Sequence, residues 1–582
     1  MPAVDRIDTS SERTPLLAGT PTPTISSRSP SPGNPITVSS TSETLAGEGY
    51  NDNDPTLSPS AAAASQLRAL LRPRVIIVSL FLIFLLEIVI GVSVPPINAI
   101  MESIICRQVH PDLFPSPGQG HPPVVEPAIP TLPDIFSVVL PGGGLHRIRH
   151  FAGGVVLVDD PACKAPGVQG YLAMLRGWQS TFESIVGLIV TVPYGILSDR
   201  WGRRGVMALS MAGIVASYAF MYLVFYFEDI IPLWVSLLSA AFQLFGGGGT
   251  VLVAMIYTML ADVIPSEERA VVFFRITSVF LGSQMIAGPI GGALLDWSPW
   301  LPLLLSLFAG VLCNVLILAY PETVHVHARK RTGQEEDEEA RDGYENWAKT
   351  LRARIASLWK KAGEGAMEAW DFIVTNQSVA FMLIALTFLV LGRYVSELLL
   401  QYATDRYGWS WSKASLVLTV RNGGSLFTLL VVLPAVSWFC IQRLGMDSVS
   451  KDLWLARWSG ILYIIGSLII ACAVNGTLFS VGLAWYALGS GMLAMLRSLV
   501  NAVVEEHHVG ILNSLIGFTE VLGMTFAGPA LAESLSIGLE RGGAWVGLPF
   551  FLSAVLFTIS TVVVWVFRLP QNKRGLVGEV AV

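Results

Sequence analysis

The stretch GILSDRWGRR, residues 195–204, lies between two long apolar segments of the chain. Arginines beside a membrane-crossing helix are explained by the excess of Lys and Arg in cytosolic loops. That excess does not explain Asp199, Gly195 and Gly202. A carboxylate can accept hydrogen bonds from a helix N-terminus or an arginine, and glycine permits a tight turn. The stretch therefore predicts a structured joint between two membrane helices rather than a plain anchor.

The composition places the chain among membrane proteins. Of its 582 residues, 52% are hydrophobic and only 14% are charged, whereas ordinary soluble proteins carry about 25% charged residues. The net charge of −6 is small for this length and gives no reason to expect a nucleic acid partner. The five cysteines have neither the spacing of a metal site nor the density of a disulfide scaffold. We therefore predict no metal and no cofactor.

Apolar segments long enough to cross a bilayer, about 20 residues each, recur along the chain. We predict an all-α membrane protein with twelve transmembrane helices, six in each of two bundles at residues 73–320 and 379–568. A cytosolic linker at 321–378 joins the bundles, and cytosolic tails occupy 1–72 and 569–582. The predicted spans lie near residues 75–97, 178–197, 206–226, 233–259, 271–295, 301–320, 379–402, 416–439, 455–473, 478–500, 511–535 and 545–567.

The distribution of Lys and Arg in the short flanks predicts that both termini lie in the cytosol. The opposite side then carries a long first loop, residues 101–170, which holds Cys106 and Cys163. In an oxidising compartment these two residues could form a disulfide, and two unpaired thiols are the alternative.

The first 72 residues are rich in Ser, Thr, Pro and Gly and poor in large apolar residues, which predicts a disordered tail. Within this tail, Glu12, Leu16 and Leu17 match an acidic dileucine pattern that resembles endosomal and vacuolar sorting signals. A sorting adaptor is the partner that such a signal would bind. Because the pattern is short, an ordinary pair of leucines in a linker is the alternative.

Short motifs recur in the same order in the two bundles, at a nearly constant separation. AGPIGG, which begins at Ala287, and AGPALA, which begins at Ala527, share Ala-Gly-Pro in the fifth and eleventh spans. DRWGRR has a weaker counterpart in QRLGMD, and SEER has one in VEEH. Many transporters contain such repeats, so we interpret the two bundles as pseudo-repeats.

The stretch GILSDRWGRR resembles the loop signature of the major facilitator superfamily, and it lies between the second and third spans, where that family carries it. The resemblance covers roughly residues 73–568 and is greatest to fungal members, with a fainter likeness to proton-coupled folate and haem carriers. It implies that the loop latches the two bundles together on the cytosolic side and that Asp199 stabilises the outward-open state. The matching residues are Gly195, Asp199, Arg200, Gly202, Arg203 and Arg204.

The stretch GSQMIAGPIGG in the fifth span resembles the antiporter motif of the same family, and PET at residues 321–323 resembles a frequent ending of the sixth span. Close helix packing is the alternative explanation of the glycines. The fourth span departs from the family's drug antiporters, because it has Gln243 where they usually carry an arginine. The antiporter-like residues are Gly282, Gly288, Pro289, Gly291 and Gly292.

Charged residues inside the predicted spans are informative because lipid makes each of them costly, by about 2.5 kcal/mol or more. Glu87 has no opposite charge in its own span, which favours proton or substrate handling. Arg393 and Glu397 are four residues apart and could face one another. For all of these residues, a buried ion pair that only joins helices is the alternative. The candidates for a central cavity are Glu87, Arg393, Glu397, Arg421, Arg497 and Glu520.

We therefore predict a secondary active transporter that moves a small organic solute by alternating access. Proton coupling is expected, and export by antiport is favoured over proton-coupled uptake. A receptor or scaffold with the same fold is the alternative from another class. No enzyme signature is present: GGGG at residues 246–249 lies in an apolar span and lacks the lysine of a phosphate loop. We expect a monomer surrounded by lipid, in the vacuolar, endosomal or plasma membrane.

Overall fold

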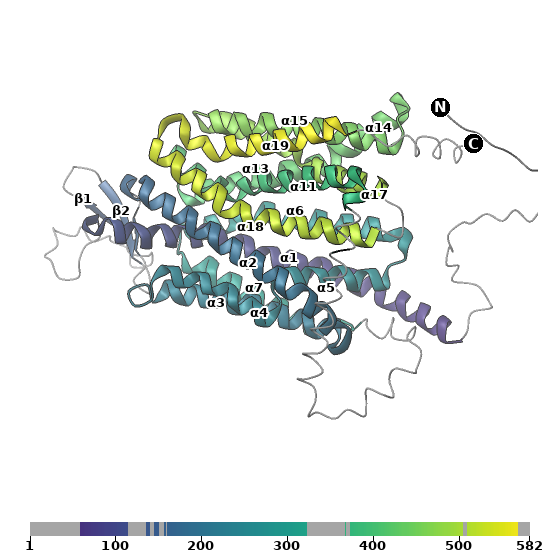
Figure 1. The fold of residues 1–582 in the computed structure, drawn as a ribbon. Helices are drawn as coiled ribbons and strands as arrows, with labels where there is room; N and C mark the ends of the chain where they lie inside the picture. The colour runs from purple at the N-terminus through teal and green to yellow at the C-terminus, as the bar shows by residue number, and fades with distance from the viewer. Residues whose placement is uncertain are drawn as a thin grey trace, which may run out of the picture. The chain divides into compact units, whose positions relative to one another are not determined.

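A computed structural model describes residues 59–113, 135–139, 145–150, 156–158, 160–322, 367, 373–503 and 509–567. All of these residues belong to one unit, Leu57–Val582. Within it, long helices run side by side (Figure 1). Helix α1 begins at Pro59, inside the segment that composition assigns to the tail. The run Ala61–Ala64 explains this earlier start, because alanine has the highest helix propensity.

The first half of the described chain contains the six predicted spans. The fourth span is a 3-10 segment followed by two helices. The elements are α1 (Pro59–Val109), α2 (Pro166–Trp201), α3 (Arg203–Tyr226), η4 (Leu233–Leu238), α4 (Ser239–Gly246), α5 (Gly248–Val263), α6 (Ser266–Leu295) and α7 (Trp300–Leu318).

The second half also contains its six predicted spans, several of which are interrupted by short 3-10 or π segments. The elements are α11 (Gln377–Arg393), η5 (Tyr394–Leu398), α12 (Leu399–Tyr407), α13 (Trp411–Phe427), η6 (Thr428–Val432), α14 (Leu433–Leu444), α15 (Ser448–Cys472), α16 (Gly476–Leu488), η7 (Gly489–Gly491), α17 (Met492–Val503), α18 (Val509–Arg541), η9 (Gly543–Gly547) and α19 (Leu548–Val566).

Eleven candidate membrane spans in the described residues are long and apolar enough to cross a bilayer. The remaining predicted span, 178–197, lies within α2, which packs against helices of both halves. The prediction of twelve helices in two groups of six agrees with this arrangement.

The break between α4 and α5 lies in the run of four glycines. Gly247 has a φ of 90°, a left-handed conformation that glycine adopts without strain. Just before the break, α4 approaches α3 very closely, since a Cβ on Gly213 would lie 2.7 Å from the Cα of Gly246. The glycine run is therefore explained by helix packing and a helix break.

The loop between α1 and α2 adds a small sheet to the predicted all-α fold. It contains η1 (Pro111–Leu113), strands β1 (Ile135–Val139), β2 (Leu145–His150) and β3 (Val156–Val158), and η3 (Pro161–Lys164). The strands form an antiparallel sheet in the order β1-β2-β3, with Phe136 opposite Ile148 and Ile148 opposite Val158. A disulfide joins Cys106, near the end of α1, to Cys163 of η3, which is the first of the two alternatives that the sequence left open. We call this end of the bundle the disulfide end.

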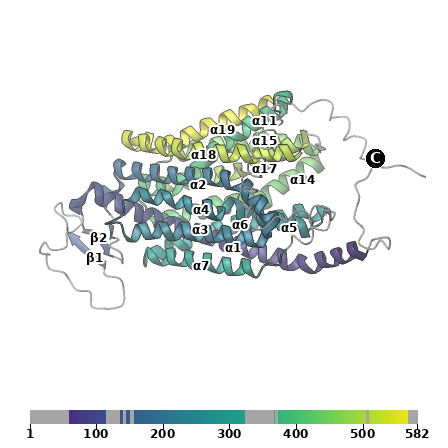
Figure 2. The same ribbon diagram turned by 60° about the horizontal axis from the view of Figure 1, so that its bottom comes forward.

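The two halves meet along two helix pairs, α2 with α18 and α6 with α13. Figures 1 and 2 both place α2 next to α18. Gly177 and Gly528 bring the backbones of α2 and α18 together, because a Cβ on Gly177 would lie 2.8 Å from the carbonyl oxygen of Gly528. Gly288 lies against α13, since its Cβ would lie 2.8 Å from the end of the Leu418 side chain, but no backbone approach occurs there. The glycine of each Ala-Gly-Pro motif therefore lies at an interface between the halves, with a close backbone contact only at α2 and α18.

The buried apolar side chains form two clusters. One cluster includes the disulfide end of the first half, such as Ile100 and Leu172, together with residues throughout the second half, such as Leu399 and Leu531. The other contains only first-half residues, including Leu82, Val206 and others nearer the opposite end. Because the shared cluster lies toward the disulfide end, the described apolar core joins the halves there.

Arg107, at the end of α1, ties this helix to the turn after α3. Its guanidinium contacts Glu228 at 2.9 Å and Asp229 at 2.8 Å. Glu228 lies outside the membrane-spanning segments and its side chain is only 4% exposed. Burial raises the pKa of Glu228 from 4.5 to about 7, although the nearby Arg107 opposes this shift.

The pH dependence of unfolding tests this assignment. Because its pKa is higher in the folded state, Glu228 contributes stability that is fully present below about pH 4.5 and is lost as the pH rises through about 7. This contribution is at most about 3 kcal/mol. We expect Glu228→Gln to reduce the difference in Tm between pH 5 and pH 8 in detergent. Asp229→Asn, at the exposed partner of Arg107, is the control, and equal pH profiles for Glu228→Gln and the unmodified protein would contradict the assignment.

Candidate functional site

The loop at residues 195–204 forms a sharp joint between α2 and α3. Gly202 separates the two helices, with a φ of 87° that favours glycine. The carboxylate of Glu322, just after α7, accepts hydrogen bonds from the backbone N–H groups of Arg203 and Arg204, both at 3.1 Å. It thus places negative charge at the N-terminus of α3, where the helix dipole stabilises it. A Cβ on Gly202 would lie 2.6 Å from this carboxylate, so the glycine also makes room for Glu322.

The two described arginine side chains of this loop bind the first half. Arg203 forms an ion pair with Asp262 at the end of α5, and both residues are 8% exposed. Arg203 also donates to the carbonyl oxygen of Thr258 at 3.3 Å, and Arg204 donates to that of Leu318 at 3.4 Å. The side chains of Asp199 and Arg200 lie outside the described residues. A latch between the halves through Asp199 therefore stays a prediction.

Truncation of Glu322 tests its role in this joint. Glu322→Ala removes both the acceptor and the charge at the N-terminus of α3, and we expect a loss of about 1–2 kcal/mol of stability. Glu322→Gln keeps an acceptor without the charge and should fall between Glu322→Ala and the unmodified protein. Thermal unfolding in detergent measures this order, with Glu540→Ala as an exposed control. A Tm for Glu322→Ala equal to that of the control would contradict this role.

The antiporter-like glycines of α6 face two different partners. A Cβ on Gly291 would overlap the carbonyl oxygen of Val92 in α1, within the first half. Gly292 instead lies against Ser415 of α13, across the interface with the second half. Gly282 has open space where its Cβ would lie. Pro289 lies inside α6. Close packing thus accounts for Gly288, Gly291 and Gly292, while a role in antiport stays a prediction.

In the first half, acidic side chains lie buried within the helices. Glu87 of α1 is 4% exposed and hydrogen-bonded to Gln284 of α6. No Lys or Arg forms an ion pair with it among the described residues. On α2, Arg176 donates to Gln179 at 2.9 Å, and Gln179 donates to Glu183 at 3.4 Å. Arg176, Gln179 and Glu183 therefore form a polar stripe along α2.

The stripe on α2 is close to the second half. Tyr394 of η5 is hydrogen-bonded to Ser180, and the charges of Arg176 and Glu183 act on it. Thr181 crosses the same interface, donating to the carbonyl oxygen of Thr525 at 2.9 Å. Sequence reasoning did not include Glu183 among the central candidates, although a carboxylate in a predicted span was the available signal.

In the second half, Arg393 and Glu397 are not joined by an ion pair among the described side chains. The α-helix ends at Arg393 and continues as the 3-10 segment η5. In a 3-10 helix, residues three apart share a face, so the i, i+4 arrangement expected for an α-helix is lost. Arg393 is hydrogen-bonded to Tyr463 instead. Glu397 is exposed.

Tyr486 of α16 contacts the end of α11, because its hydroxyl donates to the backbone oxygen of Arg393 at 3.5 Å. Arg421 of α13 makes no ion pair with the described acidic residues. Among the described side chains, no ion pair therefore joins Arg393, Glu397 and Arg421.

Arg497 of α17 and Glu520 of α18 form an ion pair between neighbouring helices. The Arg497 guanidinium donates to both carboxylate oxygens of Glu520, at 2.5 and 2.6 Å for Nη2. The side chain of Arg497 is 47% exposed and that of Glu520 is 19% exposed. Because a charged group such as the exposed Arg497 is costly in lipid, this ion pair is suited to face an aqueous passage.

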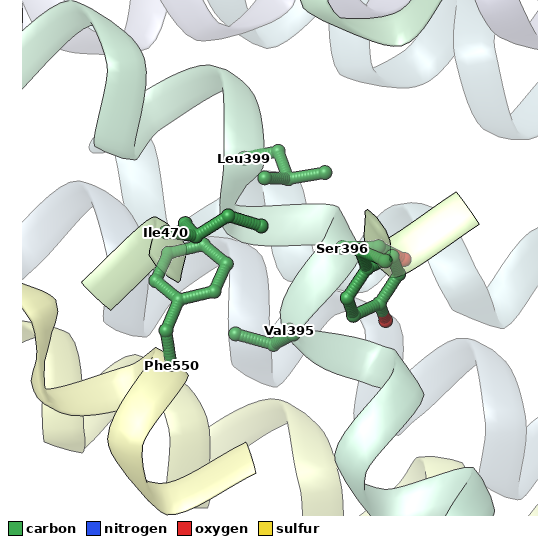
Figure 3. A pocket seen from close by; sticks show the side chains of 6 residues that line it. Val395, Ser396, Leu399, Ile470 and Phe550 are labelled. Carbon is green, nitrogen blue, oxygen red and sulfur yellow. The ribbon is translucent and has the colours of Figure 1, made fainter. Parts of the chain in front are cut away.

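A small apolar void lies among the helices of the second half. It has no room for a water molecule and is lined by Val395, Ser396, Leu399, Ile470, Tyr486 and Phe550 (Figure 3). A solute site normally holds several hundred cubic ångströms and a few converging polar groups. We therefore assign this void to packing. No group of metal-binding side chains gathers in the described part of the chain.

One sequence prediction lies outside the structure, and one structural feature lies outside the sequence predictions. The sorting-signal residues Glu12, Leu16 and Leu17 lie outside the described residues. A buried polar cluster at the disulfide end was not predicted. Its acidic member, Glu102, lies one helical turn before Cys106, so a charge at the end of a predicted span was the available signal.

Comparison with known proteins gives a family and several relatives. The profile of the Major Facilitator Superfamily matches residues 169–526. The efflux pump ustT of Aspergillus flavus is 30% identical over 407 residues, covering 68% of this chain and 77% of that pump. The class C tetracycline resistance protein of Escherichia coli is 26% identical over 387 residues, covering 66% and 82% of the two chains.

Solved structures give the same fold. The nucleoside transporter NupG superposes with a TM-score of 0.52 at 12% identity, and the match covers 85% of this chain and 100% of the NupG chain. The inward open xylose transporter XylE from E. coli superposes with a TM-score of 0.52 at 13% identity, covering 86% and 98% of the two chains. At these identities the likeness concerns the fold alone.

Proposed function

The chain belongs to the major facilitator superfamily, and we propose that it exports a small organic solute in exchange for protons by alternating access. The observation that carries this proposal is the placement of ionisable groups inside the membrane bundle. Glu87 is buried in the first half, while Arg497 and Glu520 form an ion pair in the other half. Groups of this kind inside a membrane protein are costly and usually serve transport or proton movement.

The direction of transport is supported by the relatives. The efflux pump ustT and the tetracycline resistance protein are named for export or resistance. We propose that both termini of this chain face the cytosol, so that the joint at residues 195–204 is cytosolic and the disulfide end faces the opposite compartment. A disulfide on that side is consistent with an oxidising environment.

Glu87 has the features of a proton carrier in this scheme. A buried, unpaired carboxylate is unfavourable in a low-dielectric site. A carboxyl group that binds a proton when its site is closed to water, and releases the proton when water enters, would avoid the free-energy cost of a buried charge. The hydrogen bond to Gln284 can persist in both protonation states, because an amide can both donate and accept.

Flux in proteoliposomes tests this function. We expect an imposed pH gradient to drive a solute from a panel of organic anions, zwitterions and cations against its own gradient, with proton and solute moving in opposite directions. Co-movement in one direction would replace antiport with uptake. Binding of a panel solute without flux in either direction would favour a receptor or scaffold.

The role of Glu87 is tested in the same vesicles. Glu87→Gln removes the titratable proton while keeping size and hydrogen bonding, so we expect it to lower pH-driven flux at least tenfold while solute exchange continues. Glu540→Gln, at an exposed carboxylate at the end of α18, is the matched control and should retain flux. Unchanged pH-driven flux in Glu87→Gln would remove Glu87 from the proton path.

A further inference from the structure

Five polar side chains are gathered at the disulfide end, where the two halves meet. Glu102 of α1, Gln169 of α2, Gln401 of α12 and Trp411 of α13 are between 0% and 7% exposed. The fifth residue is Lys164, at the end of η3. Polar groups buried this deeply are unfavourable unless they bind one another.

Glu102 is the centre of this cluster and binds three donors. Lys164 Nζ donates to its Oε1 at 2.5 Å, and Gln169 Nε2 donates to the same oxygen. Trp411 Nε1 donates to Oε2 at 2.5 Å. Lys164 and Gln169 belong to the first half, whereas Trp411 belongs to the second. The carboxylate therefore has two permanent partners and one partner that crosses the interface.

Two further contacts cross the interface at the same place. Gln401 Nε2 donates to the backbone oxygen of Gln169 at 2.6 Å and to its side-chain oxygen at 3.2 Å. The ammonium of Lys164 lies 5.1 Å from the ring centroid of Trp411, within the range of a cation–π interaction. The indole of Trp411 thus contacts both members of the Lys164–Glu102 ion pair.

The disulfide holds the first-half part of the cluster in place. Cys106 lies one turn after Glu102 on α1, and its partner Cys163 directly precedes Lys164. Gln169 also donates to the carbonyl oxygen of Cys163 at 3.1 Å. Because the disulfide ties Lys164 to α1, the Glu102 carboxylate that accepts the indole N–H stays beside Lys164 when the second half moves away.

We propose that Glu102, Lys164, Gln169, Gln401 and Trp411 form a gate that closes the disulfide end, and that the Trp411–Glu102 hydrogen bond sets its opening equilibrium. This inference rests on the proposed function, because alternating access requires these cross-half contacts to break in each cycle. On opening, water replaces the indole N–H of Trp411 as a donor to the Glu102 carboxylate. The carboxylate retains its contacts with Lys164 and Gln169. The gate therefore opens without leaving a carboxylate unpaired, which keeps the cost of opening moderate.

Two substitutions weaken the gate, and the matched Trp409→Phe variant accounts for the ring volume that Trp411→Phe removes. Trp411→Phe removes the indole N–H and keeps an aromatic side chain near Lys164. Glu102→Gln removes the charge that strengthens the hydrogen bond. Trp409→Phe is the matched control, because Trp409 makes its described ring contacts with Tyr407, Phe479 and Lys413 of its own half.

The experiment measures the accessibility of single cysteines in the full chain, reconstituted in liposomes. Cys313, Cys440 and Cys472 are free and are first replaced by serine or alanine, leaving the disulfide intact. Ser536→Cys reports the disulfide end, because Ser536 of α18 lies against Gly170 of α2 across the interface. Asn501→Cys reports the opposite end, near the end of α17. A membrane-impermeant maleimide, added from each side, is the probe.

We expect Trp411→Phe to raise the labelling rate at Ser536→Cys about tenfold or more, the effect of losing one hydrogen bond to a charged group. Labelling at Asn501→Cys should fall in the same variant, which local loosening alone would not cause. Glu102→Gln should act in the same direction, and Trp409→Phe should match the starting protein. Monodisperse elution and equal expression establish that the variants are folded.

Equal labelling of Trp411→Phe and Trp409→Phe at Ser536→Cys would overturn the gate. A rise at Ser536→Cys without a fall at Asn501→Cys would reduce the cluster to a local packing role and overturn it as well. The labelling needs no solute. If labelling changes as expected but the protein shows no flux, the gate is retained and the transport proposal is rejected. If the protein shows flux but labelling does not change, the transport proposal is retained and the gate is rejected.

Discussion

The close approach of α2 and α18 at Gly177 and Gly528 is the contact on which the arrangement of the two halves depends. Helices in lipid gain little from the hydrophobic effect on meeting one another, so backbone proximity and interhelical hydrogen bonds provide much of the association. Small residues along this line let the halves touch without interlocking large side chains. The halves can therefore be held together and still separate, which is the mechanical requirement of alternating access.

Within that constraint, the polar residues divide into permanent and breakable contacts. Arg203, Asp262 and Glu322 join elements of a single half and fix the joint between α2 and α3. The contact of Trp411 with Glu102 and that of Gln401 with Gln169 join different halves. A rigid half needs contacts of the first kind, and a movable interface needs contacts of the second kind, which are few and locally replaceable.

Much of this architecture was predictable from the sequence, because membrane spans and positive-inside loops follow from hydropathy and charge. The Ala-Gly-Pro repeats indicated the pseudo-repeat, and in the structure the glycine of each motif lies at an interface between the halves. Arg393 and Glu397 did not pair, because η5 changes the helical periodicity in the segment between them. That change depends on tertiary packing rather than on a local sequence signal.

The cluster around Glu102 could not be assembled from the sequence, since its members come from elements that are distant along the chain. The positions of Cys106 and Cys163 suggested a disulfide, but not that it would hold Lys164 beside a carboxylate. Conversely, the role of Asp199 comes from the family resemblance. The contacts described for its loop are those of the neighbouring arginines with the first half.

The most direct test of the central claim is a pair of distance measurements between spin labels on the two halves. Labels at Ile230 and Val474, each 79% exposed, report the disulfide end. Labels at Gly205, where a Cβ would meet nothing within 4 Å, and at Leu444, which is 60% exposed, report the opposite end. Under an imposed pH gradient with a transported solute, the disulfide-end distance should lengthen as the opposite distance shortens. Distances that change in the same direction, or that stay fixed while flux proceeds, would contradict alternating access by these two halves.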